Sequence, residues 1–495
     1  MKKTLQKHSR KSTHKTVRTR AARTVRAQRN GARRTTATKV PSTQPQTART
    51  AGTKVGIHIR MYRVGFGDFF LLSFPAPSGP PLYVLVDCGV HAVDLNSLDD
   101  AVADMAKLTS GQLALVIMTH RHADHISGFG RCAKAFAGFN VERVWMSWFE
   151  DPKNAAAASY QSTLTAVATN LQAAFALRAD APDSDYVRMV QNATGELSAA
   201  GGPTGNQAAL NVLRGGFKNR PPIDYYQAGD TATLPDSLVQ AGVTAKILGP
   251  PIDPDLVAEM DGKGHQYLST NSDDGAAPKR FSQVFNSSKA AYPQEAFELY
   301  TPDEISKNIA AAQPDLAIAK ATQVDNTINN QSLVILFGLQ GKTLLLAGDA
   351  QWGNWQNFLF GGALGTAGHN GLTDEAKQIL GNIDVYKVGH HGSTNATPID
   401  AVNAMRADAI AMCSTQPGAY GKPENNSEVP RIPLIAALNK KTENQLARSD
   451  SVMVPGADTP QIQQFEKNNP PGPLPPVFQA GSSGAAGQLY VELEI

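Results

Sequence analysis

The feature that most constrains this chain is the stretch Thr119–Gly128, which follows an apolar run of strand length and composition. In an extended segment, residues two apart point to the same side, so His120 and His122 can share one ion. Asp124 and His125 follow where the chain must turn, and they can face a second ion. Imidazole nitrogens and carboxylate oxygens are the ligands of catalytic zinc. The stretch therefore predicts a metal site.

Chance is a poor explanation, because the chain has only 11 histidines and three of them fall in this stretch. The spacing His-x-His-x-Asp-His resembles the signature of the metallo-β-lactamase superfamily. The resemblance implies an α/β fold, the four-layer αββα sandwich of that superfamily, here with helical and irregular insertions. It also implies a metal-dependent hydrolase.

Two further phrases resemble the nuclease-like DNA-uptake (late competence) branch of the superfamily. The first is VGFGDFFLLSF followed by YVLVDCG, in which Phe66 stands where the branch usually has Gln. By resemblance, Asp87 lies under the metal site and orients a ligand or the reactive water. A strand-end Asp that accepts backbone N–H bonds is the alternative, and one carboxylate can do both.

The second resemblance lies in two motifs, NxSLV…LLLAGD and KVGHHGS, which match the branch closely. By resemblance, Asp349 bridges two metal ions. We assign the second-metal ligand to His391 and a catalytic, substrate-facing role to His390, because Gly392 lets the backbone approach the site beside His391. More distant relatives would favour the opposite assignment.

The remaining site residues are expected around these motifs. Ser393 ends KVGHHGS, and Lys422 stands where the branch usually has His, so both are candidates for substrate binding. Many superfamily members have a third His before the bridging Asp. The only His in that interval is His265, which we interpret as a solvated loop residue.

Together these residues predict two divalent ions, zinc by ligand type with manganese as the alternative. The expected metal ligands are His120, His122, Asp124, His125, Asp349 and His391, and the expected catalytic residues are Asp87, Asp124 and His390. A two-metal site activates water and stabilises a reacting phosphate, which suits phosphodiester hydrolysis. The resemblance to the DNA-uptake branch and the basic N-terminal residues both indicate nucleic acid, so we expect a nuclease or phosphodiesterase acting on DNA or RNA. A hydrolase of a small ester or phosphodiester, or a metal-binding subunit of a larger complex, remains open.

Charge divides the chain into two parts. Residues 1–54 hold 16 Lys and Arg and no acidic residue, whereas the rest has 30 basic and 43 acidic residues. The first part has few large apolar residues and predicts a disordered basic tail that binds nucleic acid through counterion release. A targeting segment or a solubilising tail is the alternative.

Residues 55–495 are expected to form the catalytic domain. Inside it we expect a helical insertion at 153–215, an irregular insertion at 252–315 and a Pro/Gly-rich loop at 469–487 before a final strand. The helical insertion could cap the active site or bind a partner protein, and the irregular insertion could also bind a partner. We expect no membrane span and, from three scattered cysteines, no disulfide framework and a cytoplasmic location.

Local patterns also predict individual elements. Strands are expected at 55–63, 69–74, 82–86, 113–118, 141–148, 329–337, 342–347, 383–388 and 407–414. By resemblance to the DNA-uptake branch, further strands are expected at 224–230, 245–250, 446–450 and 489–495. Helices are expected at 98–108, 126–136 and 434–439. A hairpin with its turn at Gly338–Gly341 joins the two strands before Asp349.

Overall fold

The structure is a computed structural model, and the residues that it describes all belong to the unit Thr53–Ile495. It describes residues 56–162, 165–166, 205–260, 262–267, 326–366, 368–421, 423, 427–452, 467, 472–481 and 488–495. The basic tail, Lys422 and most residues of the two predicted insertions lie outside these ranges.

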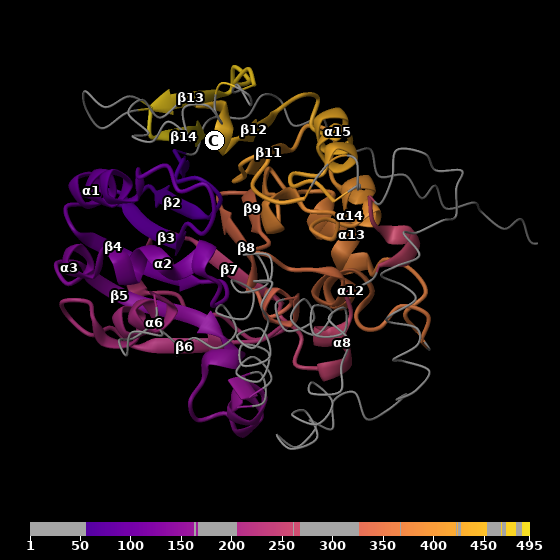
Figure 1. Ribbon diagram of the computed structural model, residues 1–495, viewed down its shortest axis with the longest axis horizontal. Helices are drawn as coiled ribbons and strands as arrows, with labels where there is room; N and C mark the ends of the chain where they lie inside the picture. The colour runs from indigo at the N-terminus through magenta and orange to yellow at the C-terminus, as the bar shows by residue number, and fades with distance from the viewer. Residues whose placement is uncertain are drawn as a thin grey trace, which may run out of the picture. The chain divides into compact units, whose positions relative to one another are not determined.

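Two mixed β-sheets form the centre of this unit (Figure 1). The first has eight strands in the order β13 (Phe478–Gly481), β14 (Tyr490–Glu494), β1 (His58–Tyr62), β2 (Phe69–Phe74), β3 (Leu82–Cys88), β4 (Gln112–Met118), β5 (Asn140–Ser147) and β6 (Ile223–Tyr226). The second has six strands in the order β12 (Leu446–Arg448), β11 (Ile410–Cys413), β10 (Val385–Lys387), β9 (Lys342–Leu346), β8 (Val334–Leu339) and β7 (Thr244–Gly249). In both sheets, the strands that carry the predicted site run parallel to a neighbour.

The two sheets pack face to face through alternating apolar side chains. Ile117 of β4 and Leu344 of β9 point into the core between the sheets, where Trp145 stacks on Phe337 with ring centroids 6.2 Å apart. Val116, next to Ile117 in β4, points to the outer face of the first sheet and contributes to a second core. Because alternate residues of a strand face opposite sides, each sheet is buried on both faces.

Helices cover the outer faces and complete four layers. The eight-stranded sheet is covered by α1 (Leu98–Thr109), α2 (Ala123–Arg131), α3 (Ala133–Phe136) and α6 (Gly205–Gly215). The six-stranded sheet is covered by α12 (Trp352–Phe360), α13 (Asp374–Leu380), α14 (Ile399–Ala404) and α15 (Ile432–Lys441). Figure 1 shows these two groups of helices on opposite sides of the sheets. The predicted α/β, αββα sandwich is therefore confirmed.

Several local predictions need correction. Helix α6 falls at the end of the predicted helical insertion, but Ala209 and Leu213 are fully buried against the first sheet, so it belongs to the outer helical layer. Strand β13 lies in the segment predicted as a loop and pairs with β14. Strands β12 and β14 correspond to the strands expected at 446–450 and 489–495, and they belong to different sheets.

Smaller features complete the description. The hairpin turn is tighter than predicted, because β8 continues to Leu339 and only Gln340 and Gly341 connect the strands, both with positive φ. The predicted irregular insertion begins with α8 (Pro254–Ala258), which packs on α12. Also present are α7 (Asp236–Gln240), η1 (Trp148–Glu150), η2 (Lys263–His265), η3 (His390–Gly392) and η5 (Ser449–Ser451). The three cysteines are buried and free, and within the described residues no helix is long and apolar enough to cross a membrane.

Candidate metal centre

The candidate site lies where strands of both sheets end. Asp87 comes at the carboxyl end of β3, and the Thr119–Gly128 stretch leads from β4 into α2. Asp349 follows β9 and the His390-His391 pair follows β10. Because the carboxyl ends of neighbouring parallel strands meet at one edge of a sheet, the packed sheets bring these four segments together.

Two glycines allow this close approach. A Cβ on Gly89, after β3, would lie 2.4 Å from the backbone nitrogen of His125. Gly348, with a φ of +51°, precedes Asp349, and a Cβ there would lie 2.9 Å from Cβ of Ser332 and 3.0 Å from Cβ of Thr119. Side chains at these two positions would push α2 and the β9 loop away from the site.

His125 is the centre of the cluster and is fully buried. Its Nδ1 lies 2.8 Å from Oδ2 of Asp87 and its Nε2 lies 3.0 Å from Oδ2 of Asp349. Asp87 also accepts hydrogen bonds from the backbone N–H of Thr119 at 2.8 Å and from its hydroxyl at 2.7 Å. Asp87 thus holds both the end of β4 and the ring of His125.

His391 approaches the same cluster from the second sheet. It is fully buried, and its Nε2 lies 3.2 Å from Oδ2 of Asp124 and 3.4 Å from Oδ2 of Asp349. Its Nδ1 lies 2.9 Å from the carbonyl oxygen of Ser414, which suits an N–H donor at Nδ1 and a lone pair at Nε2. Possible ligand atoms of Asp124, His125, Asp349 and His391 all lie within 4.8 Å of one another.

His120 and His122 lie beside this group. The ring of His120 is centred 4.1 Å from that of His125 and 4.7 Å from that of His122. Nδ1 of His120 lies 3.2 Å from the hydroxyl oxygen of Ser332, and that oxygen also accepts the backbone N–H of Asp349 at 3.0 Å. Ser332 thereby fixes His120 and the loop of Asp349 relative to each other.

Two site residues were not predicted from the sequence. Asp68 is buried, with Oδ2 3.7 Å from Nδ1 of His125 and Oδ1 3.5 Å from Nδ1 of His391. Lys387, at the end of β10, forms a buried ion pair with Asp68, donates to the carbonyl of Gly348 at 3.0 Å and lies 3.8 Å from Oδ1 of Asp349. The signals in the sequence are an Asp directly after the Gly65–Gly67 turn and a Lys inside an apolar strand.

Burial and neighbouring charges set the protonation of the cluster. Burial lowers the pKa of His120 well below its usual value and that of His122 to about 4. Burial alone would raise the pKa of Asp349, but His125 and His391 hold it well below its usual range. For His125 itself, burial favours a lower pKa, but the surrounding carboxylates, Asp349 first, raise it well above the usual value. An ion bound to His125 therefore displaces a proton.

The sequence-predicted substrate-side residues lie at the edge of the cluster. His390 has a side-chain exposure of 22%, and its Nε2 lies 4.0 Å from Oδ2 of Asp349. The hydroxyl of Ser393 lies 2.8 Å from Nδ1 of His390 and donates to Oδ1 of Asn395 at 2.7 Å. Ser393 therefore orients His390, whereas Lys422 lies outside the described residues.

One interpretation of the sequence was wrong. His265 is half-buried rather than solvated: its ring stacks on Trp352 with centroids 4.9 Å apart, and its Nδ1 pairs with Asp400. It lies in η2. Phe66, which replaces the Gln of the branch, packs on the ring of His391 with centroids 4.2 Å apart.

The residues present suit divalent cations. Nε2 of His120 and Oδ1 of Asp349 are buried and have no hydrogen-bond partner within the described part of the chain. Buried polar atoms are normally satisfied, so these atoms have a capacity that a cation would fill. The donor set of imidazole nitrogens and carboxylate oxygens is that of zinc or manganese sites.

The chain matches no protein-family model and no curated protein. Among solved structures, it is similar to the metallo-β-lactamase fold protein YhfI from Bacillus subtilis, with 9% identity over 79% of this chain and 96% of that chain and a TM-score of 0.31. It is also similar to a β-lactamase domain protein from Burkholderia ambifaria, with 17% identity over 42% of this chain and 49% of that chain and a TM-score of 0.21. At such identities and TM-scores, neither similarity bears on the reaction, which we infer from the side chains.

The different surroundings of His391 and His390 predict different effects of their removal. His391→Ala removes an imidazole from the centre of the cluster, so bound metal should fall to about half or less of the wild-type amount. His390→Ala should keep the wild-type metal content, because its ring lies at the edge. Metal analysis of the dialysed, folded variants tests this prediction. Loss of metal from His390→Ala but not from His391→Ala would show that His390 is the metal ligand.

Proposed function

We propose that the protein is a metal-dependent hydrolase that cleaves phosphodiester bonds in nucleic acid. The observation that carries the proposal is the convergence of Asp124, His125, Asp349 and His391 within 4.8 Å, with His120 and His122 beside them. Two divalent ions, zinc by ligand type or manganese, would be held by these six side chains. Bound there, the ions would supply Lewis acidity, which makes water a nucleophile near neutral pH and offsets charge on the reacting phosphate.

Other side chains of the protein would orient the metal ligands and transfer protons. Asp87 fixes the ring of His125 through its 2.8 Å contact, and Lys387 offsets the charge of Asp68 inside the buried cluster. His390 is the partly exposed imidazole at the edge, and Ser393 holds its Nδ1. His390 is therefore placed to exchange a proton with a substrate or leaving-group oxygen, with Nε2 as the reacting atom.

Attraction of a polyanion is assigned to the basic tail. Near the cluster, the guanidinium of Arg121 is bound to both carboxylate oxygens of Glu150, at 2.7 and 2.9 Å, and Lys387 is bound to Asp68. These cations already offset protein carboxylates, so they contribute little to the capture of a polyanion. The 16 positive charges of residues 1–54 would supply it instead. The insertions remain candidates for binding a partner protein.

The proposal predicts cleavage of labelled single- or double-stranded DNA or RNA by the purified full chain with added zinc or manganese. Chelation should abolish the activity, and Asp349→Ala should lower kcat/KM by about a thousandfold, because several kcal/mol of charge stabilisation is lost. Asp408→Ala, at an exposed carboxylate paired with Arg406, is the matched control and should retain wild-type activity. Hydrolysis of a small chromogenic phosphodiester without cleavage of any nucleic acid would instead favour the small-ester alternative.

Removal of residues 1–54 takes away the tail's positive charge. It should weaken the binding of nucleic acid without changing the rate of hydrolysis at the metal centre. Affinity for nucleic acid should fall and its dependence on salt should flatten, because fewer counterions are released on binding. Turnover of a small chromogenic phosphodiester should change by less than about twofold. Binding titrations at several salt concentrations test this, and an unchanged slope would show that the tail has another purpose.

A further inference from the structure

Two of the predicted metal ligands lie on a short linker between a strand and a helix. His120 and His122 fall after the strand pairing of β4 ends at Met118 and before α2 begins at Ala123. The regular hydrogen bonds of a sheet or a helix therefore do not fix the directions of these two rings. Their placement depends on contacts that hold the linker from outside, and Arg121, the residue between them, makes several.

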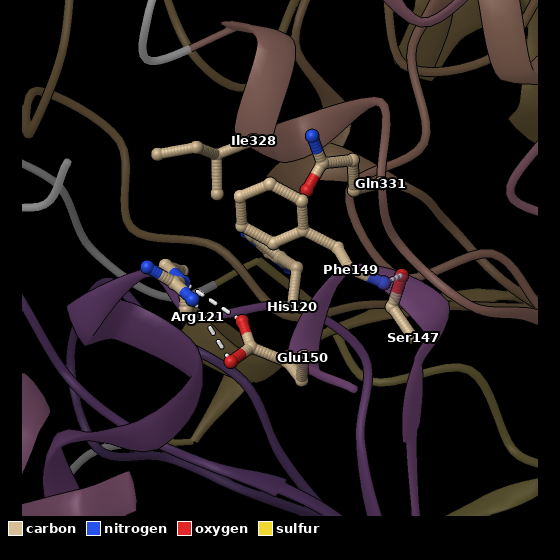
Figure 2. A pocket seen from close by; sticks show the side chains of 7 residues that line it. All are labelled: His120, Arg121, Ser147, Phe149, Glu150, Ile328 and Gln331. Carbon is tan, nitrogen blue, oxygen red and sulfur yellow. Dashed lines mark hydrogen bonds and ion pairs between the residues drawn. The ribbon is translucent and has the colours of Figure 1, made fainter. Parts of the chain in front are cut away.

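The guanidinium of Arg121 is held in one orientation by a buried carboxylate. Glu150, in η1 directly after β5, is 1% exposed. Its Oε1 accepts a hydrogen bond from Nε of Arg121 at 2.7 Å, and its Oε2 accepts one from Nη2 at 2.9 Å, as Figure 2 shows. The guanidinium also lies over the ring of Phe149, with Cζ 4.7 Å from the ring centroid. Two parallel bonds and a stacked ring fix both the position and the plane of the guanidinium.

Helix α6 contacts the same pair. Nη2 of Arg214 donates to Oε2 of Glu150 at 3.0 Å, and Nδ2 of Asn206 donates to the backbone carbonyl of Arg121 at 3.0 Å. The side chain of Arg121 is thus bound by Glu150, and its backbone is bound by Asn206. The linker that carries the two imidazoles is therefore attached to η1 and to α6 as well as to its own neighbours in the chain.

Burial of Glu150 is unfavourable on its own, because the carboxylate loses its hydration. Two guanidinium groups replace the water here. A buried ion pair nevertheless contributes little stability compared with apolar side chains of similar size. A forked pair does supply a fixed geometry, and the residue that it fixes, Arg121, stands between two candidate metal ligands.

We propose that Glu150 is a positioning residue for metal binding. Through Arg121 it sets the directions of His120 and His122, and thereby the affinity for the ion that these two rings hold. The inference rests on the proposed metal-dependent function and goes beyond it, because Glu150 is not itself a candidate ligand. Groups that orient metal ligands from outside typically change metal affinity by about 10–100-fold when they are removed.

The test is a titration of zinc into the metal-free full chain with a competing chelator, which gives two dissociation constants per chain. Glu150→Gln keeps the shape of the side chain but loses its charge, and it should raise one Kd by about 10–100-fold. The other Kd should change by less than about twofold, because the ligands Asp124, His125 and His391 lie outside the linker. Arg121→Lys keeps the charge but loses the fork, and it should raise the same Kd by about tenfold.

A second buried ion pair provides the matched control. Arg60 of β1 and Asp104 of α1 have side-chain exposures of 10% each and an N–O distance of 2.6 Å. Asp104→Asn also leaves a buried guanidinium without its charged partner, so it should lower the stability of the fold while leaving both dissociation constants unchanged. If Asp104→Asn and Glu150→Gln weaken zinc binding alike, Glu150 has only a structural role and the inference fails.

A double-mutant cycle identifies the ion concerned. His122→Ala removes a ligand of the ion assigned to the linker, which leaves one Kd to measure. Glu150→Gln added to His122→Ala should then change that remaining Kd by less than about twofold. A further rise of about tenfold or more would show that Glu150 acts on the fold as a whole, and it would overturn the inference.

The same titration separates failure of the inference from failure of the proposed function. Wild-type protein that binds no zinc would refute the metal centre and the positioning role together. Wild-type protein that binds two ions, with unchanged dissociation constants in the folded variants, would refute the positioning role alone. Arg121→Lys keeps a positive charge beside Glu150, so it decides the question if Glu150→Gln does not fold.

Discussion

The placement of the site depends on the hydrogen bonds and ion pairs of one buried residue, His125. Its Nδ1 faces Asp87 at the end of β3 in the first sheet, and its Nε2 faces Asp349 at the end of β9 in the second. A single ring thus joins the carboxyl ends of strands from both halves of the sandwich. Burying this many charged groups is unfavourable unless each is paired, so the close packing of the sheets and the pairing of the cluster require each other.

Much of the fold was predictable because local patterns and tertiary packing agree. The strands from β2 to β5 follow apolar alternation and lie within two residues of the predicted positions. The β8–β9 hairpin also forms, but β8 begins at Val334 rather than at the predicted residue 329. Helix α12 was missed because eight of its nine residues are buried, which leaves no polar face and no helical period. Strand β13 was missed because an edge strand in a Pro- and Gly-rich segment carries little strand signal.

The site was predictable where its residues are adjacent in the sequence and obscure where they are not. The stretch from His120 to His125 is recognisable as a metal-binding motif because its ligands are adjacent in the sequence. The ion pair of Asp68 with Lys387 joins residues far apart in the chain, so no local pattern reveals it. Local sequence patterns also did not predict the backbone conformations at the site. Asp87, His390 and His391 all have positive φ, at 55°, 43° and 51°. Such conformations cost about 1–3 kcal/mol each in non-glycine residues, and they cluster here at the candidate metal centre.

The central claim is that the buried His and Asp cluster holds two divalent ions. The most direct measurement is the metal content of the purified full chain by elemental analysis, after it has been supplied with zinc or manganese and dialysed. The account predicts about two ions per chain, because six candidate ligands from both sheets converge there. A value near zero in folded protein, with either metal, would contradict it.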